Sequence, residues 1–124
     1  MDMTVFIVDD DRDIREMLTE ILKDEGYAIA TAADGLDALA QLRTQAQTPC
    51  LILLDLMMPK MNGWEFCAAQ QQDPRLSPIP VVVISARADI DRAVAQIPVA
   101  GHLSKPIDID RLLHIVERHC AEYR

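Results

Sequence analysis

The chain has 124 residues, enough for one domain with one hydrophobic core, and half of its residues are hydrophobic. Its 20 acidic and 12 basic residues give a formal net charge of −8, which disfavours direct binding to nucleic acid or to an anionic membrane surface. No apolar stretch approaches the roughly 20 residues of a membrane span, and no basic segment followed by an apolar one marks a secretion signal. We therefore expect residues 1–124 to form a single cytoplasmic domain that binds neither nucleic acid nor membrane directly.

Three cysteines, Cys50, Cys67 and Cys120, bear on the redox environment of the protein. They form no Cys-x-x-Cys pair and no metal-ligand spacing. An odd number of cysteines at wide spacing fits a reducing cytosol in which the thiols are free. We expect all three to be free thiols that pack as small buried hydrophobic side chains.

Strand and helix patterns alternate along the chain. The run 3–8 is short and apolar and predicts a strand, after which apolar residues recur at helical spacing over 11–25 and Gly26 ends the helix. By the same reasoning we expect strands at 27–31, 50–54, 81–84 and 99–103, and helices at 36–42, 64–72, 89–96 and 108–122. Asp11 and Asp108 stand where a side chain caps the first turn of the first and last helices.

Five β–α units in succession predict an α/β fold, with a parallel sheet, right-handed crossovers and helices on both faces. We expect the flavodoxin-like, doubly wound form, with five strands in the order 2-1-3-4-5 and five helices. In that order the first and third strands are neighbours, and a ligand site lies beyond their carboxyl ends.

Charged and polar residues follow the predicted strands at this edge of the sheet. Asp9 and Asp10 follow the first strand, Asp55 the third, Ser85 the fourth, and Lys105 comes just after the fifth. Three carboxylates that close together cannot all stay ionised without a cation. Hard oxygen ligands beside a lysine match Mg²⁺ and a phosphate group, so the pattern indicates phosphoryl chemistry with a divalent metal.

Four segments resemble, in order, the signature of response-regulator receiver domains of two-component signalling, of the chemotaxis-regulator type. They are Val-Asp-Asp-Asp at 8–11, Leu-Asp-Leu-Met-Met-Pro at 54–59 with Gly63, Ile-Ser-Ala at 84–86, and Ser-Lys-Pro at 104–106. The resemblance covers essentially the whole chain, and each segment falls at the end of the expected strand.

The resemblance implies a role for each of these residues. Asp55 is expected to be the phosphoacceptor, a carboxylate nucleophile that forms an aspartyl phosphate. Asp9 and Asp10 are expected to hold Mg²⁺ together with Asp55, with Asp10 as the direct ligand, and the backbone carbonyl of Met57 completes the protein ligands. Lys105 is expected to pair with the phosphoryl group, or with Asp55 in its absence.

Three further features belong to the expected switch. Ser85 supplies the hydroxyl that moves toward the phosphoryl group, and Pro106 follows the lysine in what is usually a cis peptide. His102 occupies the position where the family usually has a Tyr or Phe that swings inward when the hydroxyl moves. A histidine can rotate in the same way, and a polar side chain that simply faces solvent is an equally good interpretation. The stretch between Ser85 and Lys105 is about two residues short for the family, so the fourth helix is expected to be short or irregular, and dimerisation through it is in doubt.

The expected function is a signalling switch rather than an enzyme, because the domain catalyses only its own phosphorylation and dephosphorylation. A histidine kinase or histidine phosphotransfer protein would donate the phosphoryl group, and a downstream protein would bind the switched surface of a monomer or weak dimer. One alternative is a phosphatase of the haloacid dehalogenase type, a class that has a second Asp two residues after the nucleophile, where this chain has Met57. The other is a binding module that works without phosphorylation, whose mark would be loss of Asp55, Asp10 or Lys105.

Overall fold

The computed structural model describes residues 3–120. Its strands are β1 (Thr4–Val8), β2 (Ala28–Ala32), β3 (Leu51–Asp55), β4 (Val81–Ser85) and β5 (Gly101–Ser104). Its helices are α1 (Arg12–Asp24), α2 (Gly35–Thr44), α3 (Gly63–Gln71), α4 (Ile90–Val94) and α5 (Ile109–Cys120). These bounds agree with the sequence pattern to within one or two residues, except that the expected end of the last helix at 122 lies outside the described residues.

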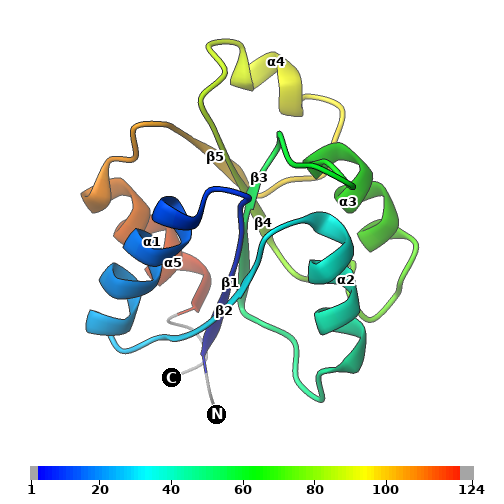
Figure 1. Cartoon of the computed structure of the whole chain (residues 1–124), viewed down its shortest axis with the longest axis horizontal. Helices are drawn as coiled ribbons and strands as arrows, with labels where there is room; N and C mark the ends of the chain where they lie inside the picture. The colour runs from blue at the N-terminus through cyan, green and yellow to red at the C-terminus, as the bar shows by residue number, and fades with distance from the viewer. Residues whose placement is uncertain (1–2, 121–124) are drawn as a thin grey trace.

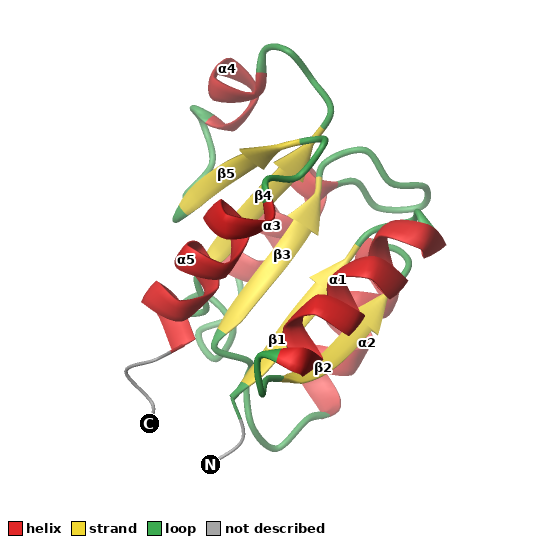
Figure 2. Cartoon of the chain, turned by 90° about the vertical axis from the view of Figure 1, so that its left-hand side faces the viewer, coloured by secondary structure: helices red, strands yellow, loops and turns green. Residues whose placement is uncertain are grey.

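The five strands form one sheet in the order β2-β1-β3-β4-β5, and every neighbouring pair is parallel. Figure 2 shows the strands lying beside one another with their arrowheads toward the same edge of the sheet. The predicted flavodoxin-like order is therefore confirmed. Because all strands run the same way, the residues that follow them gather at one edge.

The helices cover both faces of the sheet and divide the core into two clusters. Along β1, Phe6 and Val8 point to the face covered by α2 and α3, while Val5 and Ile7 point to the face covered by α1 and α5 (Figure 1). Both β3 and β4 are buried at every position, which explains why their sequences are continuous apolar runs rather than alternating ones.

The helix ends are set by local side-chain bonds. Asp11 and Asp108 cap α1 and α5 through their carboxylates, as the sequence predicts. Asp34 caps α2, and Asn62 forms a reciprocal capping box at the start of α3, which the sequence pattern did not single out. After α1, Gly26 has a φ of 95°, a left-handed conformation that favours glycine. No helix within residues 3–120 is long and apolar enough to cross a membrane.

The expectation of three free thiols is wrong. Cys50 and Cys120 are joined by a disulfide, with their Cα atoms 5.4 Å apart and a sequence separation of 70. Wide spacing along the chain does not prevent pairing, because the fold brings the start of β3 to the end of α5. Among the described residues, Cys67 is the free cysteine, and it is buried as expected.

Candidate functional site

The parallel register brings three aspartates together. Val8 of β1 lies opposite Leu54 of β3, so the next residues, Asp9 and Asp55, emerge side by side at the carboxyl edge of the sheet. One carboxylate oxygen each from Asp9, Asp10 and Asp55 lie within 4.8 Å of one another. Asp9 and Asp55 are buried, at 2% and 6% exposure, while Asp10 is exposed. The cluster therefore has a buried floor and an open, solvent-facing side.

Lys105 reaches the same cluster from the loop after β5. Its Nζ is 3.1 Å from Asp9 Oδ2 and 3.9 Å from Asp55 Oδ2. The sequence predicted Asp55 as the partner of this lysine, but the shorter contact is with Asp9. The peptide bond between Lys105 and Pro106 is cis. The lysine lies against both buried carboxylates and supplies one positive charge to three acids.

One lysine does not neutralise the three carboxylates of the cluster, and the pKa of Asp55 is raised. Burial, with the nearby charge of Asp9, raises the pKa of the Asp55 carboxyl group to about 6, against an ordinary value of 3.8. Lys105 and a backbone N–H bond from Met57 lower that pKa, and Asp10 adds a further rise. A divalent cation bound among these oxygens would favour the ionised form.

The loop after Asp55 is packed tightly against the end of β3. The Met57 backbone nitrogen lies 3.4 Å from Asp55 Oδ1, and Met57 is 57% exposed. A Cβ atom at Gly63 would lie 2.8 Å from the Leu56 Cα and 2.9 Å from the Asp55 carbonyl oxygen. Only glycine allows this approach, so Gly63 holds the loop that frames the Asp55 side chain.

Ser85 ends β4 beside this cluster and is buried, with 1% of its surface exposed. Its Oγ accepts a hydrogen bond of 3.1 Å from the Arg87 N–H, and its backbone carbonyl accepts one of 2.9 Å from the Lys105 N–H. The hydroxyl hydrogen remains available to a ligand, because an oxygen that accepts can also donate. The serine and the lysine are thus linked through their backbones.

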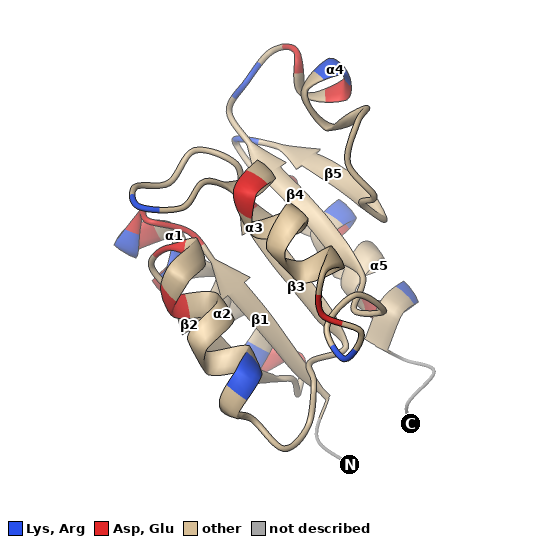
Figure 3. Ribbon diagram, turned by 90° about the vertical axis from the view of Figure 1, so that its right-hand side faces the viewer, with Lys and Arg blue, Asp and Glu red and all other residues tan. Residues whose placement is uncertain are grey.

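His102 lies on β5, where it contacts α4 rather than the acidic cluster. Its Nε2 is 2.7 Å from Asp91 Oδ1, and 30% of its side chain is exposed. Figure 3 shows acidic and basic residues on α4 and in the segment before it. α4 spans only Ile90–Val94, so it is short as expected and shorter than the predicted range 89–96.

The structure also shows contacts that sequence reasoning missed. Arg15 on α1 donates from its guanidinium to the backbone carbonyl of Asp9, at 2.7 Å. Trp64 on α3 donates its indole N–H to the carbonyl of Ala93 in α4, at 2.8 Å, and Arg87 lies 5.6 Å from the indole ring centroid. Both acceptors are backbone carbonyls, which leave no mark in the sequence.

The donor set at the carboxyl edge fits a hard divalent cation. Carboxylate oxygens are the ligands that Mg²⁺ prefers, and one exposed acid beside two buried ones leaves room for water and phosphate oxygens. No sulfur or imidazole ligand is among them. Within residues 3–120 this group of acids could therefore hold a metal ion.

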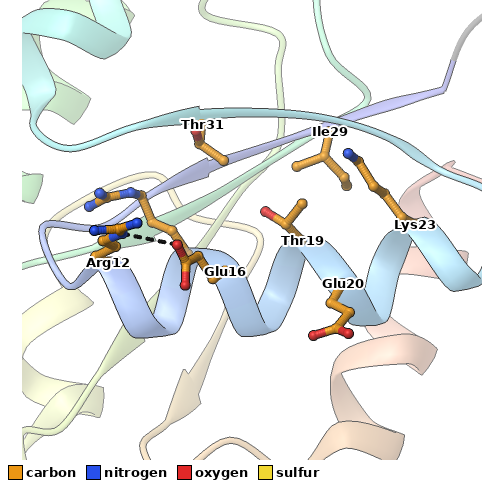
Figure 4. Close-up of a pocket in the computed structure, with 8 residues that line it drawn as sticks. Arg12, Glu16, Thr19, Glu20, Lys23, Ile29 and Thr31 are labelled. Carbon is orange, nitrogen blue, oxygen red and sulfur yellow. Dashed lines mark hydrogen bonds and ion pairs between the residues drawn. The ribbon is translucent and has the colours of Figure 1, made fainter.

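A separate groove of about 600 Å³ runs between α1 and the edge strand β2 (Figure 4). Its charged lining residues come from α1 and are of both signs, with Arg12 paired to Glu16 at 2.9 Å. None of the three clustered aspartates lines it. The groove therefore does not form part of the acidic site.

Comparison with known proteins gives one consistent result. The family model described as response regulator receiver domain matches residues 5–117. Protein PilG of Pseudomonas aeruginosa is 32% identical over 124 residues, which cover 98% of this chain and 90% of the relative. The Vibrio cholerae chemotaxis protein CheY4 is 30% identical with a TM-score of 0.85, covering 96% of this chain and 99% of that one. The phosphorylated cyanobacterial phytochrome response regulator RcpA is 30% identical with a TM-score of 0.82, covering 100% and 97%.

The sheet order, the acids at its carboxyl edge and these matches agree in assigning the chain to a family of two-component signalling domains with a phosphoacceptor role. The phosphatase alternative is not favoured, because Asp55 ends the third strand along the chain and not the first. The chain belongs to the response-regulator receiver domain family.

Proposed function

We propose that Asp55 accepts a phosphoryl group from a histidine kinase or a histidine phosphotransfer protein. One observation carries this proposal: the Asp55 carboxylate is buried at the carboxyl edge of the sheet, in one cluster with Asp9 and Asp10 and 3.9 Å from Lys105 Nζ. Among the three acids it alone combines burial with a position on the middle strand. It is therefore the carboxylate that we expect a donor phosphate to meet, beside both the proposed cation site and the lysine.

In the proposed transfer, a carboxylate oxygen of Asp55 attacks the phosphorus of a phosphohistidine. A new P–O bond forms on Asp55 while the P–N bond of the donor breaks, and the electron pair stays with the imidazole nitrogen. The ionised form of Asp55 is the nucleophile, and with a pKa of about 6 it predominates at neutral pH. The reaction spreads negative charge over the phosphoryl oxygens, which must be met by positive groups.

Asp9, Asp10, Asp55 and the Met57 carbonyl are the proposed ligands of Mg²⁺, which when bound would neutralise charge on the phosphoryl oxygens. Lys105, whose Nζ is 3.9 Å from Asp55 Oδ2, supplies the second positive charge. Ser85 supplies a hydroxyl hydrogen to a phosphoryl oxygen, because in this structure its Oγ accepts a hydrogen bond from the Arg87 N–H and can still donate its own hydrogen. With the cation bound, these residues of the chain would thus position and stabilise the phosphoryl group.

The proposed switch follows from the charge that phosphorylation adds, which is about −1.5 to −2. Movement of Ser85 toward the new group would pull on Arg87, whose N–H bonds to the serine oxygen. Arg87 lies over Trp64 and pairs with Asp89 at the start of α4, so the pull would be transmitted to α4. His102 would respond through its contact with Asp91. The changed α4–β5 surface would then bind a downstream protein.

The remaining parts of the proposal concern the setting of the domain. We propose that residues 1–124 act as one receiver domain, as a monomer or weak dimer, in the cytoplasm. Its own phosphorylation and dephosphorylation are the only reactions it would catalyse, and it would bind neither nucleic acid nor membrane directly. The Cys50–Cys120 disulfide is unusual in a reducing cytoplasm, where such bonds are rare.

The acceptor is tested by labelling the protein with acetyl phosphate in the presence of Mg²⁺ and locating the added phosphate by mass spectrometry. We expect labelling of the native chain, loss of labelling in Asp55→Asn, and normal labelling in Asp24→Asn. The control changes the same residue type at an exposed position near the end of α1. Phosphate found on another residue of the native chain would refute Asp55 as the acceptor.

A further inference from the structure

The Cys50–Cys120 disulfide connects two elements at the end of the molecule opposite the acidic site. Cys50 directly precedes β3, whose other end carries Asp55. Cys120 is the last described residue of α5. The bond therefore holds the end of α5 against the amino edge of the sheet.

The position of Cys120 on the helix means that this bond limits local opening of the last described turn of α5. The buried residues of α5 are Leu112, Val116 and Cys120, spaced four apart, so they form one stripe against the sheet. Cys120 is the final member of that stripe and is fully buried. Helix ends open more easily than helix centres, because their backbone bonds are fewer. A covalent bond at this point suppresses that opening.

The surroundings of Cys50 accommodate a thiol as well as a disulfide. The Cys50 sulfur lies 3.4 Å from the backbone carbonyl oxygen of Thr4. A disulfide sulfur has no hydrogen to donate, so this contact becomes a hydrogen bond only when Cys50 is reduced. Both cysteines also lie in the apolar cluster beneath α1 and α5, where a small thiol packs well. The reduced pair therefore fits the same packing as the disulfide.

The third cysteine cannot exchange with this pair. Cys67 lies on α3, in the core cluster on the other face of the sheet. Burial raises the pKa of its thiol to about 11, so it is not a thiolate at neutral pH. The pair therefore gains and loses two electrons as an isolated couple.

We propose that the Cys50–Cys120 bond is a redox-responsive clamp on the last turn of α5, opened by a protein dithiol. A thiolate of the dithiol attacks the sulfur of Cys50, because Cys50 is the less buried residue of the two, at 7% exposure against 0% for Cys120. The S–S bond breaks, a mixed disulfide forms, and the second thiol of the dithiol displaces Cys50 from it. Two electrons and two protons end on Cys50 and Cys120, and the dithiol becomes a disulfide. In a reducing compartment such bonds are usually transient and redox-sensing.

The clamp is tested on the full chain, isolated with its thiols blocked by an alkylating reagent and then compared before and after treatment with dithiothreitol. Mass spectrometry of the never-reduced, denatured protein should find one alkylated cysteine, Cys67. On reduction, the amides of 117–120 that exchange by local opening should exchange roughly tenfold faster, while the amides of α2 that exchange by local opening stay unchanged. Cys120→Ser should show the raised exchange without reduction. Cys67→Ser, the matched control, should respond to dithiothreitol like the native chain.

Three outcomes would overturn the proposal. The first is alkylation of all three cysteines in the never-reduced protein, which means that the bond does not form. The second is unchanged exchange over 117–120 on reduction. The third is an equally large rise in the amides of α2 that exchange by local opening, which means that the effect of the bond is not confined to α5. Labelling of Asp55 by acetyl phosphate is measured on the same samples. The clamp requires no phosphoryl chemistry. If acetyl phosphate does not label Asp55, this result contradicts the proposed function and leaves the clamp proposal unaffected.

Discussion

The Asp55 carboxylate should destabilise the resting protein at neutral pH, so that Asp55→Asn increases the free energy of unfolding. Burial and the neighbouring acids raise the pKa of this group from 3.8 to about 6. A group that holds its proton more tightly in the folded chain contributes most to stability below pH 3.8. That contribution falls as the pH rises from about 3.8 to about 6 and is lost above it.

The size of the effect follows from the same two pKa values. A difference of 3.8 to about 6 corresponds to at most about 3 kcal/mol of unfolding free energy. Asparagine has nearly the shape of aspartate and can still accept from the Met57 N–H, so the exchange removes the charge and little else. We therefore expect Asp55→Asn to be more stable than the native chain by up to about 3 kcal/mol at pH 7.5, and by much less near pH 4.

The measurement is urea denaturation of both proteins from pH 4 to pH 8 in the presence of EDTA. Glu20→Gln is the control, because it removes one negative charge from an exposed position in the middle of α1. Added Mg²⁺ should stabilise the native chain more than Asp55→Asn and so narrow the difference. A stability gain that is absent at pH 7.5, or larger at pH 4 than at pH 7.5, would refute the electrostatic account of the cluster.

The remaining predictions concern three other parts of the molecule. Asp10→Asn should weaken Mg²⁺ binding by at least roughly tenfold in calorimetry, and unchanged binding would remove Asp10 from the ligand set. Trp64→Phe deletes the indole N–H that bonds to the Ala93 carbonyl, so the free energy of unfolding in urea should fall by about 1 kcal/mol and amide hydrogen exchange in α4 should become faster. Exchange in α4 at the same rate as in the native chain would argue against the contact. Reducing the Cys50–Cys120 bond should cost up to about 4 kcal/mol, because it removes a link across 70 positions from the unfolded chain, and an unchanged denaturation midpoint would contradict this.

The parts of the fold that sequence predicts are those set by local pattern. Continuous apolar runs predict buried strands such as β4, and the parallel order then places Asp9 beside Asp55 without any knowledge of side-chain packing. The cap at Asp11 is equally local, since its carboxylate bonds within the next three residues. These features depend on residue spacing alone.

Other features depend on how distant segments pack. Lys105 approaches Asp9 more closely than Asp55 because of the exact path of the loop after β5, which no motif encodes. Three cysteines allow three different pairs, and only the packed fold shows that Cys50 meets Cys120. In the same way, the Trp64 partner is a backbone carbonyl and carries no residue-type signal.

The contact between Trp64 and α4 gives the protein an internal optical probe. The chain has a single tryptophan, so its ultraviolet emission comes from one known place. That indole bonds to α4 and lies beneath the guanidinium of Arg87, two residues beyond Ser85. Changes in emission intensity or wavelength would therefore follow α4 in real time, without a dye attached to the surface.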